Sequence, residues 1–264
     1  MNFESYTTLA LSRRDRILNV CFNRPEALNA VDQQMHADIV RCFSEMASDP
    51  DSDVVIISGI GKVFSAGGDL QHIQNMVERP SLFLAEMLDA KRLIFALLEC
   101  PKPVIAKLNG HAIGLGATIA LFCDLAFAVP GAKLGDPHVR IGFVAGDGGA
   151  VIWPHLIGHA RAKEYLLTGR AITAEEAERI GLINRVVSVD SIDTVVDQFA
   201  DELASSPKLA VQWTKMSINI ALKQQTQAIL DASIALEALS NMTQDHAEAV
   251  KALREKRAPM FTGT

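Results

Sequence analysis

The sequence has few cysteines and no arrangement of them that suggests a disulfide framework or a metal site. Its four cysteines, Cys21, Cys42, Cys100 and Cys123, are widely spaced, and no C-x-x-C pair occurs. Such residues are most simply small hydrophobic side chains, buried and reduced. We therefore expect a cytoplasmic protein without disulfides.

An excess of basic charge is also missing. The formal net charge is -6, with acidic and basic residues scattered along the chain. A nucleic-acid partner would need a basic stripe, so we expect none. An anionic ligand would have to be held locally, by a few cations and by helix N-termini.

Long apolar runs are absent as well. The most apolar run, "AIGLGATIALFC", stops at Asp124, well short of the roughly 20 residues of a membrane-spanning helix. The first residues, "MNFESYTTLALSRR", lack the apolar core of a secretion signal. With 49% hydrophobic and 21% charged residues among 264, the chain has the balance of a globular protein with a sizeable core and no membrane contact.

The first part of the chain alternates between strand and helix patterns. The segments "TTLALSR" and "ILNVCFN" flank the polar "RDR" and predict a β-hairpin. Residues 31–49 place Met35, Ile39, Phe43 and Met46 on one helical face. Short β-branched runs such as "DVVIISG" then alternate with helical stretches, which predicts an α/β core over residues 1–190.

From about Ser191 the pattern is helical only. Four segments follow with no strand between them, and several are apolar on more than one face. Apolar residues form one stripe of Leu209, Trp213, Met216 and Ile220, and a second of Leu230, Ile234, Leu236 and Leu239 in the next helix. We therefore expect residues 191–264 to be a helical oligomerisation region.

Two glycine-rich turns each join a strand to a helix. One contains Gly114-Leu115-Gly116 but has Ile119 where a dinucleotide fingerprint needs a third glycine, so it is a weak signal. The other, "GKVFSAGGDL", places Asp69 near a helix start. Two such turns can aim two backbone N–H groups at one point, forming an oxyanion hole. Each turn alone is more simply explained by a backbone that needs glycine.

Four motifs taken together resemble one enzyme family. "NRPEALNA", "GKVFSAGGDL", "KPVIAKLNGHAIGLGATIALFCDLAFA" and "EKRAPMF" occur in the order found in the crotonase family, the enoyl-CoA hydratases and isomerases. The resemblance implies an α/β crotonase-like spiral of repeated ββα units, with a C-terminal helical trimerisation region. It also implies a homotrimer or a dimer of trimers, an acyl-CoA substrate, and no tightly bound cofactor, coenzyme A being part of the substrate.

The same resemblance assigns roles to four residues. The backbone N–H groups of Gly68 and Leu115 would form the oxyanion hole and hold the thioester oxygen while an enolate forms. Ala66 matches the position whose backbone meets the adenine of CoA. Lys256 matches a basic residue that reaches a CoA phosphate, often from a neighbouring subunit. Without the resemblance, Lys256 would be interpreted as a solvated surface residue.

The chain departs from the family at the acid/base positions. Enoyl-CoA hydratases hold and activate water with two glutamates, and the matching residues here are Thr118 and His138. Threonine does not titrate at physiological pH, and one histidine is not a pair of carboxylates. A site that polarises a carbonyl is therefore retained, while the groups that move protons have been replaced.

The stretch "DPHVRIGFVAGDGG" offers replacements in His138 and Asp147. Together with "WPH" at residues 153–155, it resembles 6-oxocamphor hydrolase, a crotonase relative that cleaves a carbon–carbon bond between two carbonyls with the matching histidine and aspartate. The simpler interpretation of an isolated pair is a helix-capping Asp147 and a packed loop histidine. Because His138 stands at the family's acid/base position, we favour a catalytic pair, with the histidine pKa raised if the two are within hydrogen-bond reach.

Other polar residues are given structural roles or none. His155 and His159 have the spacing of helical metal ligands, but Gly158 interrupts them and no third ligand is evident, so we expect no metal. His111 is expected to orient its turn, and Asp124 to be a buried, hydrogen-bonded structural residue. Asp136 receives no role.

Three functions remain open. The first is a hydratase-like lyase that acts on an acyl-CoA through an enolate, with His138 and Asp147 handling protons or water. The second is a hydrolase that cleaves a carbon–carbon bond of a β-dicarbonyl, for which CoA would not be required. The third is a catalytically silent CoA-binding subunit, which the missing glutamates permit.

Overall fold

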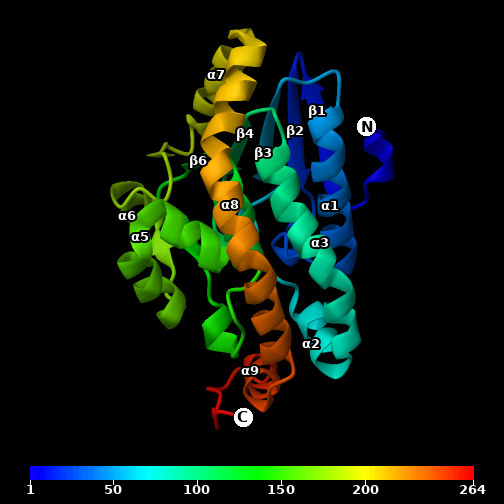
Figure 1. Cartoon of the computed structure of the whole chain (residues 1–264), viewed down its shortest axis with the longest axis vertical. Helices are drawn as coiled ribbons and strands as arrows, with labels where there is room; N and C mark the ends of the chain where they lie inside the picture. The colour runs from blue at the N-terminus through cyan, green and yellow to red at the C-terminus, as the bar shows by residue number, and fades with distance from the viewer.

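The computed structural model describes all 264 residues as an α/β fold in which helices cover central strands (Figure 1). The strands are β1 (Leu9–Arg14), β2 (Ile17–Phe22), β3 (Val54–Gly59), β4 (Val104–Leu108), β5 (Ala112–Ile113), β6 (Leu125–Ala128), β7 (Lys133–Gly135), β8 (Ile172–Thr173) and β9 (Arg185–Val186). The helices are α1 (Gln33–Ser48), α2 (Leu70–Glu78), α3 (Pro80–Glu99), α4 (Leu115–Phe122), α5 (Gly149–Thr168), α6 (Ala174–Arg179), α7 (Ile192–Ser205), α8 (Lys208–Asn241) and α9 (Gln244–Arg254), with short 3-10 helices η1 (Phe3–Ser5), η2 (Pro25–Ala27) and η3 (His138–Ile141).

Two sheets organise these elements. The larger has the strand order β1-β2-β3-β4-β6-β9, in which the predicted hairpin β1–β2 is antiparallel and every other pair is parallel. The smaller has the order β5-β7-β8. The sequence did not predict this second sheet, because strands of two or three residues are too short to show a period.

Helices α1, α3 and α8 pack side by side over the larger sheet (Figure 1). The four predicted core residues of α1, Met35, Ile39, Phe43 and Met46, are completely buried. Helix α2 continues from the turn after β3 and leads into α3 at Pro80, where the ring fits the first turn of a helix. The loops at the carboxyl ends of β3 and β4 are thereby brought under α2 and α3.

The tail consists of three helices, where the sequence suggested four. Helix α8 runs without a break for 34 residues, because the polar segment 223–227 contains no glycine or proline and its lysine and glutamines are good helix formers. Leu230 and Ile234 lie in the chain's own core, whereas Leu209, Trp213, Ile220, Leu236 and Leu239 are more than half exposed. The apolar surface left for a partner is therefore smaller than the sequence suggested.

Asp124 attaches the tail to the core. Its Oδ2 accepts a hydrogen bond of 2.7 Å from the backbone N–H of Val104 and lies 2.7 Å from the ammonium group of Lys215 on α8. Lys215 also donates to the carbonyl oxygen of Lys102 at 2.8 Å. The predicted hydrogen-bonded structural role of Asp124 is confirmed, although its side chain is half-buried rather than fully buried.

We expect Asp124→Ala to lower the free energy of unfolding by about 2 kcal/mol, because the buried Lys215 ammonium loses its counter-ion. Denaturant unfolding followed by circular dichroism measures the change. The matched control is Asp231→Ala, which removes an exposed ion pair with Lys91 and should change stability by less than about 1 kcal/mol. Equal stability of the two variants would contradict the anchoring role.

No helix combines the length and the apolarity needed to span a bilayer. All four cysteines are free thiols, and Cys42, Cys100 and Cys123 are buried as predicted, while Cys21 is half-buried. Burial raises the pKa of the Cys42, Cys100 and Cys123 thiols. They are therefore packing residues that hold no thiolate at neutral pH.

Candidate active site

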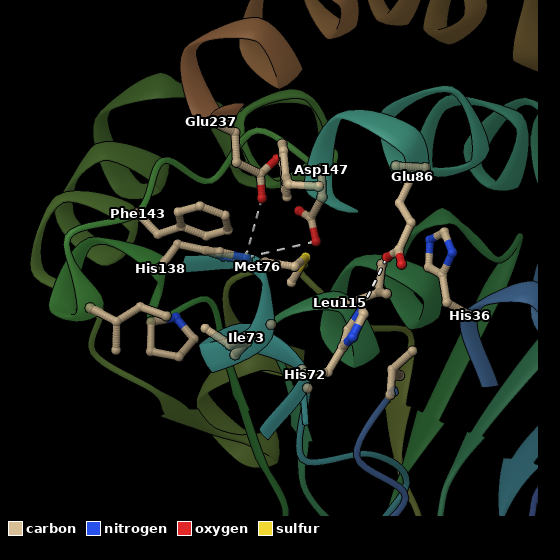
Figure 2. A pocket seen from close by; sticks show the side chains of 18 of the residues that line it. His36, His72, Ile73, Met76, Glu86, Leu115, His138, Phe143, Asp147 and Glu237 are labelled. Carbon is tan, nitrogen blue, oxygen red and sulfur yellow. Dashed lines mark hydrogen bonds and ion pairs between the residues drawn. The ribbon is translucent and has the colours of Figure 1, made fainter. Parts of the chain in front are cut away.

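One cavity of about 260 Å³ gathers most of the residues singled out in the sequence. Ala66, Gly68, Leu115, His138 and Asp147 all line it. The rest of its wall is largely apolar and comes mainly from helices α2, α3, α8 and α9, as Figure 2 shows in part. Lys256 does not line the cavity; it lies beyond the end of α9, exposed, with a left-handed φ of 54°.

The two glycine-rich turns lie against each other in this wall. The N–H of Ile113 donates to the carbonyl oxygen of Ser65 at 3.0 Å. Gly67 has a φ of 89°, and a Cβ there would lie 2.8 Å from the Ile113 oxygen. Glycine is thus required at residue 67 both by its backbone angle and by the close approach of the second turn.

Each turn has one backbone N–H group that makes no hydrogen bond within the chain. The N–H of Val31 donates to the Gly67 oxygen at 2.7 Å, and the N–H of Asp69 donates to the Val31 oxygen at 2.9 Å. In such a parallel bridge the polar groups of the middle residue, Gly68, face the other side. Leu115 is the first residue of α4, where an N–H has no partner within the helix.

His138 lies on η3, at the cavity wall, and is surrounded by three carboxylates. Its Nδ1 is hydrogen-bonded to Oδ1 of Asp136. Its Nε2 lies 3.9 Å from Oδ2 of Asp147 and 3.9 Å from Oε1 of Glu237, along the two dashed lines of Figure 2. The predicted pairing is therefore corrected in one respect: Asp136 makes the direct hydrogen bond, and Asp147 is an ion-pair neighbour beyond hydrogen-bond distance.

Asp147 is held from behind by Thr118. The hydroxyl of Thr118 donates to Oδ1 of Asp147 at 3.3 Å, so the threonine that replaces a family glutamate orients the aspartate. Helix α5 begins after Gly148, and no side chain caps it. Asp147 is therefore not the N-cap residue, although the backbone N–H of Gly149 at the start of α5 interacts with its carboxylate and opposes the rise in its pKa that burial causes.

The charges of His138, Asp147 and Glu237 influence one another. Burial alone would lower the pKa of His138, but the charges of Asp136 and Asp147 outweigh it and raise that pKa to about 10. Burial raises the pKa of Asp147, against the opposing charge of His138. Burial and the nearby Asp147 raise the pKa of Glu237 well above its usual range. The cluster thus favours an imidazolium and disfavours charge on both Asp147 and Glu237 at once.

An aromatic stack holds His138 in place from its other side. Its ring stacks on Phe143, with ring centroids 5.7 Å apart, and Phe143 stacks on His246 of α9 at 4.5 Å. Nδ1 of His246 lies 2.6 Å from the backbone oxygen of Ile141, to which it donates. The last helix of the tail therefore fixes the loop that carries the histidine.

The sequence missed two members of this cluster for different reasons. Asp136 lies two residues from His138, a spacing that allowed contact, but a short loop separation does not fix side-chain direction. Glu237 is buried at the cavity wall and comes from the C-terminal part of the long tail helix α8. No local pattern distinguishes it from the other acidic residues there, so only the packing of α8 against the core reveals it.

Three possible ligand atoms converge in this cluster. Asp136, His138 and Asp147 each offer one, and these atoms lie within 4.8 Å of one another. Nδ1 of His138 is, however, already hydrogen-bonded to Asp136. The second pair considered in the sequence is His155 and His159 on α5. His155 is hydrogen-bonded to Gln225 at 3.1 Å, and α5 is broken between the two histidines at Gly158, which has a φ of 76°.

Two further residues singled out in the sequence, Ala66 and His111, make hydrogen bonds within the chain. Ala66 donates its N–H to the oxygen of Leu28 at 3.0 Å. His111 accepts at Nδ1 from the N–H of Lys133 at 3.0 Å and so links its turn to β7.

Comparison with known proteins places the chain beside one family over nearly its whole length. The enoyl-CoA hydratase/isomerase family model matches residues 12–264. The crotonyl-CoA hydratase of Syntrophomonas wolfei is 34% identical, over 97% of this chain and 98% of its own. The 1,2-epoxyphenylacetyl-CoA isomerase of Escherichia coli is 32% identical, over 94% and 95%. A crystal structure of an enoyl-CoA hydratase/isomerase from Mycobacterium paratuberculosis superposes with a TM-score of 0.90 at 33% identity, covering 93% of this chain and 98% of that one.

Proposed function

The chain belongs to the enoyl-CoA hydratase/isomerase family and has the crotonase fold that its motifs predicted, and from this membership we propose that it is a hydratase-like lyase acting on an acyl-CoA. The single observation that supports this most is that Gly68 and Leu115, whose N–H groups have no hydrogen-bond partner in the chain, line the same cavity as the His138 cluster. Together they provide an oxyanion hole and proton-transfer groups at one place.

In the proposed reaction, His138, Asp147 and Glu237 perform the proton transfers that the two glutamates perform in the family. The carboxylate of either Asp147 or Glu237 takes a proton from water as the water oxygen bonds to the β-carbon of the enoyl group. The double-bond electrons move toward the thioester oxygen, and the N–H groups of Gly68 and Leu115 stabilise the enolate. The imidazolium of His138 returns a proton to the α-carbon, so the cluster as a whole neither gains nor loses one.

The second candidate is hydrolysis of a carbon–carbon bond between two carbonyls. The observation that favours it is the pairing of His138 with a buried Asp147 at 3.9 Å, the arrangement expected from the resemblance to 6-oxocamphor hydrolase. Water would attack one carbonyl, and the bond to the neighbouring carbon would break with its electrons forming an enolate. A silent CoA-binding subunit is disfavoured, because burying several ionisable groups is costly unless they serve a function.

A substrate panel separates the three candidates. The protein is incubated with enoyl-CoA esters and, separately, with cyclic β-diketones, and the products are followed by mass spectrometry. Addition of water to a CoA ester supports the proposal. Ring opening of the diketones alone favours the hydrolase, and CoA-ester binding with no turnover of any compound favours the silent subunit.

We also propose that the protein is a homotrimer or a dimer of trimers. Exposed Trp213 and Leu239 on α8 support a partner surface, and Lys256, outside its own chain's cavity, is free to reach a CoA phosphate bound by a neighbouring subunit. Light scattering at micromolar concentration should give the mass of three or six chains. A monomer would contradict the proposal and remove the intersubunit role of Lys256.

A further inference from the structure

A second polar group lies across the cavity from the His138 cluster. It consists of His36 from α1, His72 from α2 and Glu86 from α3, all of which line the cavity. Figure 2 shows these three side chains close to one another and apart from His138 and Glu237. The mechanism above uses none of these three residues.

The hydrogen bonds of this group are incomplete. Nε2 of His72 is bonded to Oε2 of Glu86 at 3.1 Å. The other oxygen of Glu86, Oε1, is buried without a partner. The His36 ring lines the cavity, is only 8% exposed as a residue and makes no hydrogen bond with the protein. An unpaired buried acceptor beside an unpaired imidazole is unfavourable in the free protein, and a ligand that bonds to both would remove that penalty.

The charges of the group restrict which ligand fits. The hydrogen bond to Glu86 raises the pKa of His72, which favours an imidazolium that compensates the carboxylate. Burial lowers the pKa of His36, so its ring is neutral and its N–H can donate. A ligand carboxylate would be repelled by Glu86, and a ketone oxygen accepts but cannot donate to Oε1. A hydroxyl does both, since its proton can go to Oε1 while its oxygen accepts from His36.

We propose that the acyl chain of the substrate carries a hydroxyl group beyond its β-carbon, and that Glu86 and His36 bind it. This inference rests on the proposed function, because it takes the thioester oxygen to lie at Gly68 and Leu115. Glu86 and His36 then select the acyl group, while the His138 cluster reacts at the α- and β-carbons. His72 is a positioning residue that holds the Glu86 carboxylate.

The test compares matched CoA esters that cannot react. Saturated acyl-CoA esters with straight and cyclic chains are prepared in pairs that differ only by one hydroxyl, placed at successive carbons beyond the β-position. Each is titrated into the wild-type protein by isothermal calorimetry. At one position the hydroxyl should tighten Kd about tenfold relative to its unsubstituted partner, the effect of a hydrogen bond to a charged group.

Variants then identify the residues responsible. Glu86→Leu and His36→Phe should each remove the preference, so that both members of the pair bind equally. Glu86→Gln, which keeps an acceptor oxygen, should retain part of it. The matched control is Glu78→Gln, on the exposed end of α2, where the carboxylate bonds only Gln74; it should keep the full preference. Circular dichroism establishes that each variant is folded.

The outcomes are distinguishable. If no hydroxylated ester binds better than its unsubstituted partner, the inference is overturned while CoA binding and the proposed function stand. If none of the CoA esters binds, the proposed function falls and this inference falls with it. Since the wild-type comparison needs no variant, a misfolded variant does not prevent the test.

Discussion

His138→Gln is expected to lower kcat by about 100-fold or more, the usual loss for a removed acid/base group, while Kd for the CoA ester stays near its wild-type value. Glutamine keeps a polar side chain beside Asp136 but cannot carry the proton that His138 holds up to a pKa of about 10. Steady-state kinetics on the true substrate and calorimetric titration measure the two quantities separately.

The same residue predicts a pH dependence. Because the pKa of His138 is raised from 6.5 to about 10, the imidazolium persists through neutral pH and is lost as the pH rises toward 10. The wild-type pH profile of kcat/KM should therefore fall on the alkaline side, and that limb should vanish in the residual activity of His138→Gln. The stabilisation that the charged ring gives the fold should be complete below about pH 6.5 and lost over the same alkaline range.

Asp147→Asn tests the second residue of the proposed catalytic pair, and His155→Gln is the control. Asparagine keeps the size of Asp147 and the hydrogen bond from Thr118 but removes the charge, so turnover should again fall by about 100-fold. His155→Gln changes a histidine outside the cavity and should leave turnover intact. Wild-type rates in both His138→Gln and Asp147→Asn would mean that other residues handle the water.

Gly68→Pro should lower kcat by about 10²–10³-fold, because proline removes one of the two N–H donors for the enolate oxygen. The loss should fall on turnover rather than on ligand affinity, since the negative charge on that oxygen develops only during the reaction. Single-turnover rates and Kd for a saturated CoA ester give the two measurements.

Gly68→Ala is the matched control for this substitution. It keeps the N–H, and its Cβ would meet Cδ1 of Ile73 at 3.0 Å, the flexible end of a side chain that can move aside. The alanine variant should therefore retain most of its turnover. A folded proline variant with full activity would rule out the use of this N–H, and circular dichroism provides the check on folding.

Much of the fold, and part of the cavity wall, could be predicted from local sequence patterns. The β1–β2 hairpin and the buried face of α1 were predicted because each depends on residues close in sequence. The two glycine-rich turns were predicted for the same reason, since Gly67 must accept a left-handed backbone wherever the rest of the chain lies.

What escaped prediction depends on contacts between distant segments. The carboxylate of Glu237 reaches His138 only because α8 crosses the core, and Glu86 meets His72 only because α3 turns back beside α2. Even the near neighbour Asp136 was missed, since a separation of two residues in a loop does not fix the direction of either side chain. Periodicity identifies buried faces but does not show which polar residues on different elements converge.

Helix α8 belongs both to the C-terminal tail and to the wall of the cavity. At 1.5 Å per residue its 34 residues extend about 50 Å, with the Lys215 anchor toward one end and Glu237 of the reaction chamber toward the other. The exposed Trp213 and Leu239 lie on the same rod. A chimaera that exchanged the tail at residue 190 would therefore replace part of the cavity wall together with these exposed apolar side chains. An exchanged tail would have to reproduce the contacts that Glu237 makes with His138 and that His246 makes with the backbone of Ile141.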